Sequence, residues 1–285
     1  MSGKSLTGKT CLITGATSGI GKYTALGIAK LGAAVVIIGR NAEKCKATVD
    51  KIKWKTKNES VEYILADLSC QKEIRNLVKK FENKYNTLHV LVNNAGARFI
   101  IRQETVDGIE MTFALNHLAY FLLTNLLLDV LKNSTPARII NIASGNLSNS
   151  IDFNNLNQKE NYDGRKAYAQ SKLANLLFTY ELAQKLKNSD ITVNAVNPGG
   201  VATNFNRNNG WQYWLRHVIA HIISGNLKLP RRGAYASIYL ASSPEVNGVT
   251  GRFFHNDQII SSSELLFDRD LTKKLWTISE QLTGL

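Results

Sequence analysis

The sequence predicts an α/β fold: a doubly wound parallel sheet of about seven strands with helices on both faces. Short apolar runs rich in β-branched residues recur at 10–14, 33–39, 61–66, 88–92, 137–143, 191–196 and 251–255. Amphipathic segments long enough to be crossover helices separate most of these runs. Continuous apolar strands that alternate with helices indicate a parallel sheet covered on both faces. No repeat, low-complexity tract or linker divides the chain, so we expect a single domain over residues 1–285.

The predicted sheet also divides the chain by role. In a doubly wound sheet, ligands bind in the crevice beyond the carboxyl ends of the strands. The candidate functional residues are therefore those that directly follow each predicted strand. We expect a cofactor-binding half over about 1–135 and a catalytic and substrate-binding half over about 136–285.

The first predicted strand is followed by the glycine-rich turn TGATSGIG, whose glycines have GxxxGxG spacing. Glycines let a backbone approach a pyrophosphate closely, and the helix that follows offers unpaired N–H groups and a partial positive charge. Such a sequence can also be only a turn, but its position between a strand and a helix favours dinucleotide binding. The predicted cofactor contacts here are Gly15, Thr17, Ser18, Gly19, Ile20 and Gly21.

The end of the second predicted strand bears on the choice of nucleotide. Folds that bind NAD place an acidic residue there, about 20 residues after the glycines, to hold the ribose hydroxyls. This chain instead has Arg40 between Gly39 and Asn41, and a guanidinium can pair with a 2′-phosphate. The alternative is a surface arginine in an ordinary loop. The pattern favours NADP(H) as the cofactor.

The third and fourth predicted strands end in further candidate contacts. Asp67 and Leu68 follow the third strand, where the Asp67 carboxylate could accept a hydrogen bond from an adenine amino group. The fourth strand ends in NNAG, where Asn94, Ala95 and Gly96 would suit a close approach of the backbone to a ribose. A structural turn would use the same residue types.

Four polar residues form a candidate catalytic set. Ser144 follows the fifth predicted strand, and Asn116 lies in the helical segment before that strand. Tyr168 and Lys172 lie four residues apart in YAQSK of the next helix, which places them on one helix face. A free tyrosine has a pKa of about 10, and a nearby ammonium lowers that pKa by favouring the phenolate.

In their order along the chain, these motifs resemble the short-chain dehydrogenase/reductase family. The resemblance covers nearly the whole chain and includes TGATSGIG, NNAG, NHLAYF, the serine after IINIA, YAQSK and NPGG. It implies a single-domain Rossmann fold in which Tyr168 is the general acid/base and Lys172 lowers the pKa of Tyr168. Ser144 would orient the substrate oxygen, and Asn116 would hold a water for proton relay. The cofactor contacts that the resemblance implies in this half are Tyr168, Lys172, Pro198, Gly199, Val201 and Thr203.

Three longer stretches narrow the resemblance. Residues 107–131, residues 172–186 and the ending SEQLTGL resemble the NADP-preferring retinol dehydrogenase-like branch, which acts on large apolar aldehydes, ketones and alcohols. We therefore expect a small-molecule substrate that is apolar and bulky, retinoid-like or otherwise lipophilic. In the family, the region at about 204–230 covers the substrate pocket, so we expect a lid there. A packed helix or a membrane-surface helix would also explain its apolar stripe.

Charge and cysteine content restrict the partners. The net charge of +13 and pI near 9.6 suggest an anionic partner, such as a phosphorylated cofactor or a membrane surface. No recognition motif accompanies this charge, so we expect no nucleic-acid partner. Three cysteines and a short N-terminal apolar run predict a reduced, cytoplasmic protein that could contact a membrane peripherally. His217 and His221 have metal-ligand spacing, but without further ligands we expect no metal. The family resemblance suggests a homo-oligomer.

Two other functions are compatible with the motifs. A protochlorophyllide-reductase-like enzyme would carry similar glycine and YxxxK motifs but would reduce a carbon–carbon double bond. A sensor or scaffold would bind NADP without turnover, although the complete set of Asn116, Ser144, Tyr168 and Lys172 favours an enzyme.

Overall fold

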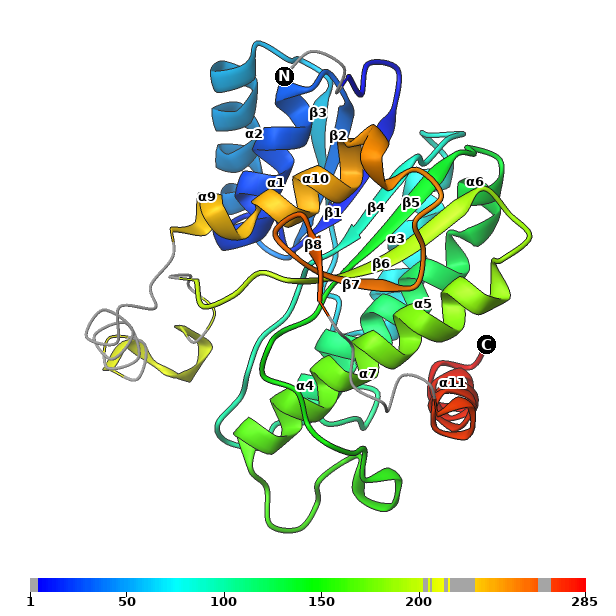
Figure 1. Ribbon diagram of the computed structural model, residues 1–285. Coiled ribbons are helices and arrows are strands. Elements are labelled where there is room, and N and C mark those ends of the chain that lie inside the picture. The colour runs from blue at the N-terminus through cyan, green and yellow to red at the C-terminus, as the bar shows by residue number, and fades with distance from the viewer. Residues whose placement is uncertain (1–4, 202–204, 206, 213–214, 216–228, 261–267) are drawn as a thin grey trace.

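The computed structural model describes residues 5–201, 205, 207–212, 215, 229–260 and 268–285, which form one central sheet covered by helices (Figure 1). The strands are β1 (Thr10–Thr14), β2 (Ala34–Gly39), β3 (Val61–Leu65), β4 (Val90–Asn93), β5 (Ala137–Ile142), β6 (Ile191–Asn197), β7 (Arg252–His255) and β8 (Gln258–Ile259). Their order across the sheet is β3-β2-β1-β4-β5-β6-β7-β8. β1 to β7 run parallel to their neighbours, and β8 is antiparallel to β7.

The predicted doubly wound parallel sheet is therefore confirmed, and each predicted strand is present. The sequence did not indicate β8. This strand is only two residues long, which is too short for a hydrophobic pattern. It returns from β7 through a tight turn in which Asn256 has a left-handed φ of 57°.

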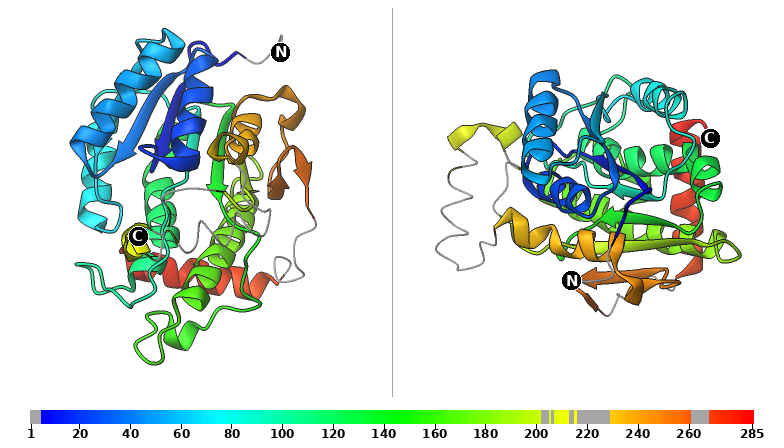
Figure 2. Two further views of the ribbon diagram at one scale, coloured as in Figure 1. Left: turned by 90° about the vertical axis from the view of Figure 1, so that its left-hand side faces the viewer. Right: turned by 90° about the horizontal axis from the view of Figure 1, so that it is seen from above.

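Helices form a layer on each face of the sheet. They are α1 (Gly19–Lys30), α2 (Ala42–Thr56), α3 (Gln71–Glu82), α4 (Met111–Phe113), α5 (Ala119–Leu126), α6 (Leu128–Lys132), α7 (Gly164–Lys185), α9 (Pro230–Gly233), α10 (Tyr235–Ser242) and α11 (Arg269–Thr283). Figures 1 and 2 show α1, α2 and α10 over one face and α3, α5, α7 and α11 over the other. Short 3₁₀ turns are η2 (Phe153–Asn155), η3 (Arg207–Asn209) and η4 (Pro244–Val246).

The alternation of side chains along the strands gives each layer its own core. In β1, Cys11 and Ile13 pack with α1 and α10, whereas Leu12 between them packs with α3, α5, α7 and α11. Successive residues of a strand point to opposite faces, so a continuously apolar strand serves both layers. Cys11, Cys45 and Cys70 are all free thiols.

The strand order reverses between β1 and β4, and this switch point places the site. β2 and β3 lie on one side of β1, and β4 to β7 lie on the other. Chain segments that leave the carboxyl ends of β1 and β4 therefore diverge, and ligands of doubly wound sheets bind in the resulting crevice. Within the described part of the chain, the predicted site residues that directly follow β1, β4, β5 and β6 lie at this edge.

The apolar segment at 111–132 is not one regular helix. It begins as α4, continues as a π-helical turn η1 (Ala114–Leu118), and then forms α5 and α6. A π-helical turn inserts an extra residue into a helix, and such turns are frequent at functional sites. Among the described residues, no helix is both long enough and apolar enough to span a bilayer.

Candidate active site

The glycine-rich turn after β1 lies against the chain that leaves β4. Gly15 has φ +63°, and a Cβ on it would lie 2.7 Å from Ala95 Cα. A Cβ on Gly21 would clash with the Asn94 side chain. The two glycines therefore let two backbone segments meet at the switch point, which no larger residue would permit without a shift.

Asn94 braces this turn from the other side. Its Nδ2 donates to the Thr14 carbonyl at 2.7 Å and to the Gly15 carbonyl at 3.2 Å. The Thr14 hydroxyl accepts from the backbone N–H groups of Asn94 at 2.8 Å and Ala95 at 2.9 Å. The Asn94 amide, predicted from the sequence as a ribose contact, is thus engaged in holding the glycine turn in place.

The amino end of α1 is suited to an anion. Gly19 begins the helix with φ +54°, and the N-cap residue Ser18 makes no side-chain capping hydrogen bond. The first turn of α1 carries no acidic residue, so the partial positive charge of the helix end is not neutralised within that turn. These features fit the pyrophosphate of a dinucleotide.

Arg40 follows β2 beside the same turn. A Cβ on Gly39 would lie 2.8 Å from Thr17 Cγ2, so the ends of β1 and β2 are closely packed. The Arg40 side chain is 71% exposed, and its Nη1 lies 3.9 Å from Asp67 Oδ2. The other oxygen of Asp67 accepts from the N–H of Ser69 at 2.9 Å and from its hydroxyl at 2.7 Å. The sequence placed no carboxylate beside Arg40, and the structure brings one there from the segment that follows the neighbouring strand β3.

Tyr168 and Lys172 are held on α7. The N-cap Asp163 starts this helix by accepting from the backbone of Arg165 at 2.7 Å. Lys172 is 2% exposed, and its Nζ donates to the Ile142 carbonyl at 2.8 Å, at the end of β5. The Nζ lies 5.9 Å from the centre of the Tyr168 ring. Burial lowers the pKa of Lys172 to about 7, because the ammonium is desolvated.

Opposing influences act on the Tyr168 phenol. Burial raises its pKa, whereas the hydrogen bond with the Ser144 side chain and the charge of Arg98 lower it. Ser144 follows β5, and its Oγ also accepts from the backbone N–H of Asn146 at 3.0 Å. The structure thus brings Ser144, Tyr168 and Lys172 together as the sequence predicted.

Asn116 joins this group from the π-helical turn. Its Oδ1 accepts from the Ala97 N–H at 2.8 Å, and its Nδ2 donates to the Ala97 carbonyl at 2.9 Å and to the Ser171 hydroxyl at 2.9 Å. A Cβ on Gly96 would lie 3.0 Å from Asn116 Oδ1 and 3.6 Å from Lys172 Nζ. The Asn116 side chain therefore ties the β4 segment to α7, and Gly96 provides the space for this contact.

The comparison with known families decides the family. The profile described as short chain dehydrogenase matches residues 9–213, which includes the glycine turn and the four candidate catalytic residues. This chain is a short-chain dehydrogenase. As a member of this family, it is an oxidoreductase that acts on alcohol and carbonyl groups with a nicotinamide dinucleotide, NAD(P)(H).

Its relatives place this dehydrogenase in the retinol dehydrogenase-like branch. Human polyprenol dehydrogenase is 39% identical over 284 residues, which cover 97% of this chain and 85% of the relative. Mouse retinol dehydrogenase 13 is 39% identical over 292 residues, which cover 98% of this chain and 84% of the relative. Human retinol dehydrogenase 14 is 38% identical over 295 residues, covering 98% and 87%.

Solved structures share the fold of this dehydrogenase. An uncharacterized protein from Mycobacterium paratuberculosis has a TM-score of 0.79 and 30% identity, covering 99% of this chain and 96% of that one. The Pseudomonas aeruginosa RhlG/NADP complex has a TM-score of 0.71 and 30% identity, covering 89% and 96%. A Burkholderia cenocepacia short chain dehydrogenase in complex with NADP has a TM-score of 0.69 and 27% identity, covering 88% and 97%.

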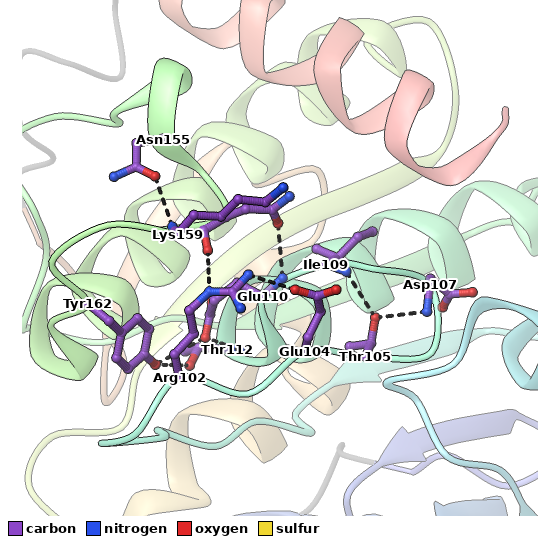
Figure 3. A network of polar contacts seen from close by, with 11 residues as sticks. Arg102, Glu104, Thr105, Asp107, Ile109, Glu110, Thr112, Asn155, Lys159 and Tyr162 are labelled. Carbon is purple, nitrogen blue, oxygen red and sulfur yellow. Dashed lines mark hydrogen bonds and ion pairs between the residues drawn. The ribbon is translucent and has the colours of Figure 1, made fainter.

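A buried carboxylate of this dehydrogenase joins the two helices that carry Asn116 and Tyr168 (Figure 3). Glu110 is 1% exposed and caps α4, accepting from the N–H groups of Thr112 and Phe113 at 2.8 Å each. The Tyr162 hydroxyl donates to the Phe99 carbonyl at 2.8 Å and lies 3.1 Å from Glu110 Oε1. Tyr162 directly precedes the cap of α7, so this contact links the starting points of both helices.

The polar stretch before α7 is held by the same network. Asn157 Oδ1 accepts from the Glu110 N–H at 3.0 Å, and the Asn157 carbonyl accepts from Arg102 Nε at 2.9 Å. A Cβ on Gly164 would clash with the Phe99 carbonyl, which shows how closely the start of α7 meets the segment after β4. The sequence motifs did not indicate Arg102, Glu110, Asn157 or Tyr162. These residues come from distant segments and form no local motif.

The segment after β6 lies beside the glycine turn that follows β1. Gly199 has φ +75°, and its N–H donates to Asn197 Oδ1 at 2.9 Å, next to Pro198. A Cβ on Gly233 would lie 2.7 Å from Val201 Cγ2 and 3.2 Å from Ile20 Cγ1, so the segments after β1 and β6 converge there.

One residue of the predicted lid reaches Tyr168. The Phe205 ring meets the Tyr168 ring edge-on, with centroids 5.3 Å apart. Phe205 is an apolar contact that the motifs did not indicate. Thr203, His217, His221 and most of the predicted lid at 204–230 lie outside the described residues.

Proposed function

We propose that this chain is an NADP(H)-dependent oxidoreductase that interconverts an alcohol and an aldehyde or ketone on a bulky apolar substrate, with Tyr168 as general acid/base. The observation that carries the proposal is the placement of a buried Lys172 ammonium beside the Tyr168 phenol, which itself contacts Ser144. That arrangement serves proton transfer at a substrate oxygen. The cofactor supplies or accepts the hydride when it is bound.

The roles of the residues follow from their contacts. In carbonyl reduction, Tyr168 donates its phenolic proton to the substrate oxygen, and in alcohol oxidation the phenolate takes that proton back. Ser144, hydrogen-bonded to the phenol, is placed to orient the same oxygen. Lys172 favours the phenolate when it is charged. Asn116 holds α7 against the segment after β4 through its hydrogen bonds with Ser171 and Ala97.

Residues at the switch point would hold the cofactor. We propose that Gly15, Gly19 and Gly21 admit its pyrophosphate at the end of α1, and that Arg40 binds a 2′-phosphate. The Arg40 guanidinium is exposed and its contact with Asp67 is long, so this surface ion pair is worth little and can give way to a phosphate. The NADP named in the Pseudomonas and Burkholderia complexes supports the choice of NADP over NAD.

The relatives support an apolar substrate. Polyprenol dehydrogenase and the retinol dehydrogenases are named for long apolar alcohols, and this chain matches them over nearly its full length. Phe205 adds an apolar surface at Tyr168. We further propose a cytoplasmic homo-oligomer that can contact a membrane peripherally through its basic surface.

A substrate screen tests the proposal. NADPH oxidation is measured with aldehydes and ketones of increasing chain length and ring size, from propanal to nonanal to retinal, with the Tyr168→Phe variant as background. We expect kcat/KM to rise with apolar size. Porphyrin-dependent oxidation without carbonyl turnover would favour the double-bond reductase, and tight NADPH binding without any turnover would favour a sensor or scaffold.

Arg40→Ala should weaken NADPH binding about 10- to 100-fold and leave NADH binding nearly unchanged. The variant removes one charge-assisted pair to the 2′-phosphate, worth about 1.5–3 kcal/mol. Dissociation constants of both cofactors are measured by fluorescence titration. Lys46→Ala is the matched control, because Lys46 is an exposed cation of α2 that is already paired with Asp50 at 2.7 Å. Equal weakening of both cofactors by Arg40→Ala would mean that Arg40 only supports its loop.

A further inference from the structure

The Lys172 ammonium lies in an unusual environment for a buried cation. It is 2% exposed, and its Nζ donates to the Ile142 carbonyl. Among the described residues, no carboxylate lies within ion-pair distance of it. A desolvated charge without a counter-ion is costly, so other groups must favour the charged form if Lys172 is to act on Tyr168.

A second tyrosine lies against this ammonium. Tyr120 is on α5, one helical turn after Asn116, and is 1% exposed. Lys172 Nζ lies over its ring, 5.5 Å from the ring centre, which is closer than the 5.9 Å to the Tyr168 ring. A cation within about 6 Å of an aromatic face is attracted by the negative potential of that face, most strongly when both are desolvated.

The other groups around Lys172 carry no compensating charge. On α7, Tyr168 lies one turn before Lys172, and Asn175 lies one turn after it and also donates to the Ile142 carbonyl. Asn116 and the buried His117 belong to the π-helical turn. Burial lowers the pKa of His117 to about 3, so this ring is neutral. The charge of Arg98 acts on Tyr168. The aromatic faces are therefore the partly negative surfaces next to the ammonium, together with the Ile142 carbonyl.

The Tyr120 hydroxyl makes no hydrogen bond to Lys172, so the ring is the part of this side chain that acts on the ammonium. The hydroxyl is buried and has no hydrogen-bond partner among the described residues. Burial and, to a smaller extent, the charge of Tyr168 raise the pKa of Tyr120. Tyr120 packs in the same apolar core as its neighbours Phe121 and Leu122, and its ring also borders Lys172.

We propose that Tyr120 is a positioning residue for the reaction, whose ring face holds the Lys172 ammonium charged and in place beside Tyr168. The inference rests on the proposed function, because it concerns the same proton transfer. Loss of the ring destabilises every state in which Lys172 is charged, including the active state with a phenolate at Tyr168. The fraction of Tyr168 that is phenolate at a given pH then falls, and its titration moves to higher pH.

Replacement of Tyr120 tests this role. In Tyr120→Leu, the titration midpoint of Tyr168 should rise by about 0.5–1.5 pH units, the range that cation–π contacts span from exposed to desolvated sites. Tyr120→Phe keeps the ring and should raise the Tyr168 midpoint by less than half as much as Tyr120→Leu does. The midpoint is measured by ¹³C NMR of ring-labelled tyrosine in the protein saturated with NADP⁺, and the Tyr168 signal is assigned by its loss in Tyr168→Phe. The alkaline shift should also lower kcat/KM for alcohol oxidation at pH 7.

Phe121→Leu controls for damage to the core. Phe121 is the next residue, is also 1% exposed, and packs on Phe178 and Trp276 away from Lys172. Its replacement should lower the melting temperature about as much as Tyr120→Leu does, without moving the Tyr168 midpoint. An equal shift in both leucine variants, an unshifted midpoint in Tyr120→Leu, or an equal shift in Tyr120→Phe would each overturn the proposal. Failure of the proposed function would be seen in a different measurement. The unmodified protein would then show no carbonyl turnover, while the NMR titration of Tyr168 could still be measured.

Discussion

Tyr168→Phe should abolish carbonyl reduction and alcohol oxidation, with kcat reduced at least about 10²- to 10⁴-fold, the usual contribution of a general acid/base. Only the phenolic oxygen is lost, and the ring can keep its edge-on contact with Phe205. Cofactor affinity should therefore change little. Steady-state rates and NADPH titrations on both proteins measure the two effects.

The matched control is Tyr162→Phe, which removes a phenolic oxygen from the network at the start of α7. It should lower the melting temperature while retaining most of the activity, since Tyr162 donates to a backbone carbonyl rather than to substrate. A Tyr168→Phe enzyme that retained a near-normal rate would remove Tyr168 from the mechanism.

Lys172→Met should make the protein inactive but more stable near neutral pH. Burial lowers the pKa of Lys172 to about 7 in the folded protein, against about 10.4 in an unfolded chain. Between these values the unfolded state binds more protons, so the cost of burying Lys172 is full below pH 7 and disappears as the pH approaches 10.4. Methionine removes that cost and fills a similar volume.

Urea unfolding at two pH values measures this effect. We expect Lys172→Met to increase the free energy of unfolding by about 1–3 kcal/mol at pH 6, and by clearly less at pH 9. The gain is smaller than the shift in pKa alone implies, because the hydrogen bond to Ile142 is also lost. A change that is equal at both pH values would show that the ammonium carries no pH-dependent cost.

Features set by neighbouring residues could be predicted from the sequence. Apolar runs gave the parallel strands, because a strand buried on both faces must be apolar throughout. The spacing of Tyr168 and Lys172 placed both on one face of α7, because four residues make about one helical turn. The glycines after β1 were readable because they occupy a recognisable junction between strand and helix.

Features set by tertiary packing could not be predicted in the same way. Asp67 reaches Arg40 because β3 pairs with β2, and only the sheet order brings them together. Glu110 and Tyr162 are 52 residues apart and meet through two irregular segments. Tyr120 lies in a run of apolar residues, and in that context the sequence predicts only a packing role for an aromatic side chain. The sequence also left Asn94 open between a ribose contact and a structural turn, and its amide is engaged in the turn.

The network in Figure 3 has a consequence for transplanting specificity between members of this family. The segment around Arg102 and Glu110 and the segment around Asn157 and Tyr162 share their hydrogen bonds, so neither is complete alone. Exchanging one of them with a relative would leave the buried Glu110 carboxylate facing unmatched partners. The two segments are therefore a single exchangeable module, and a graft from a relative must carry both.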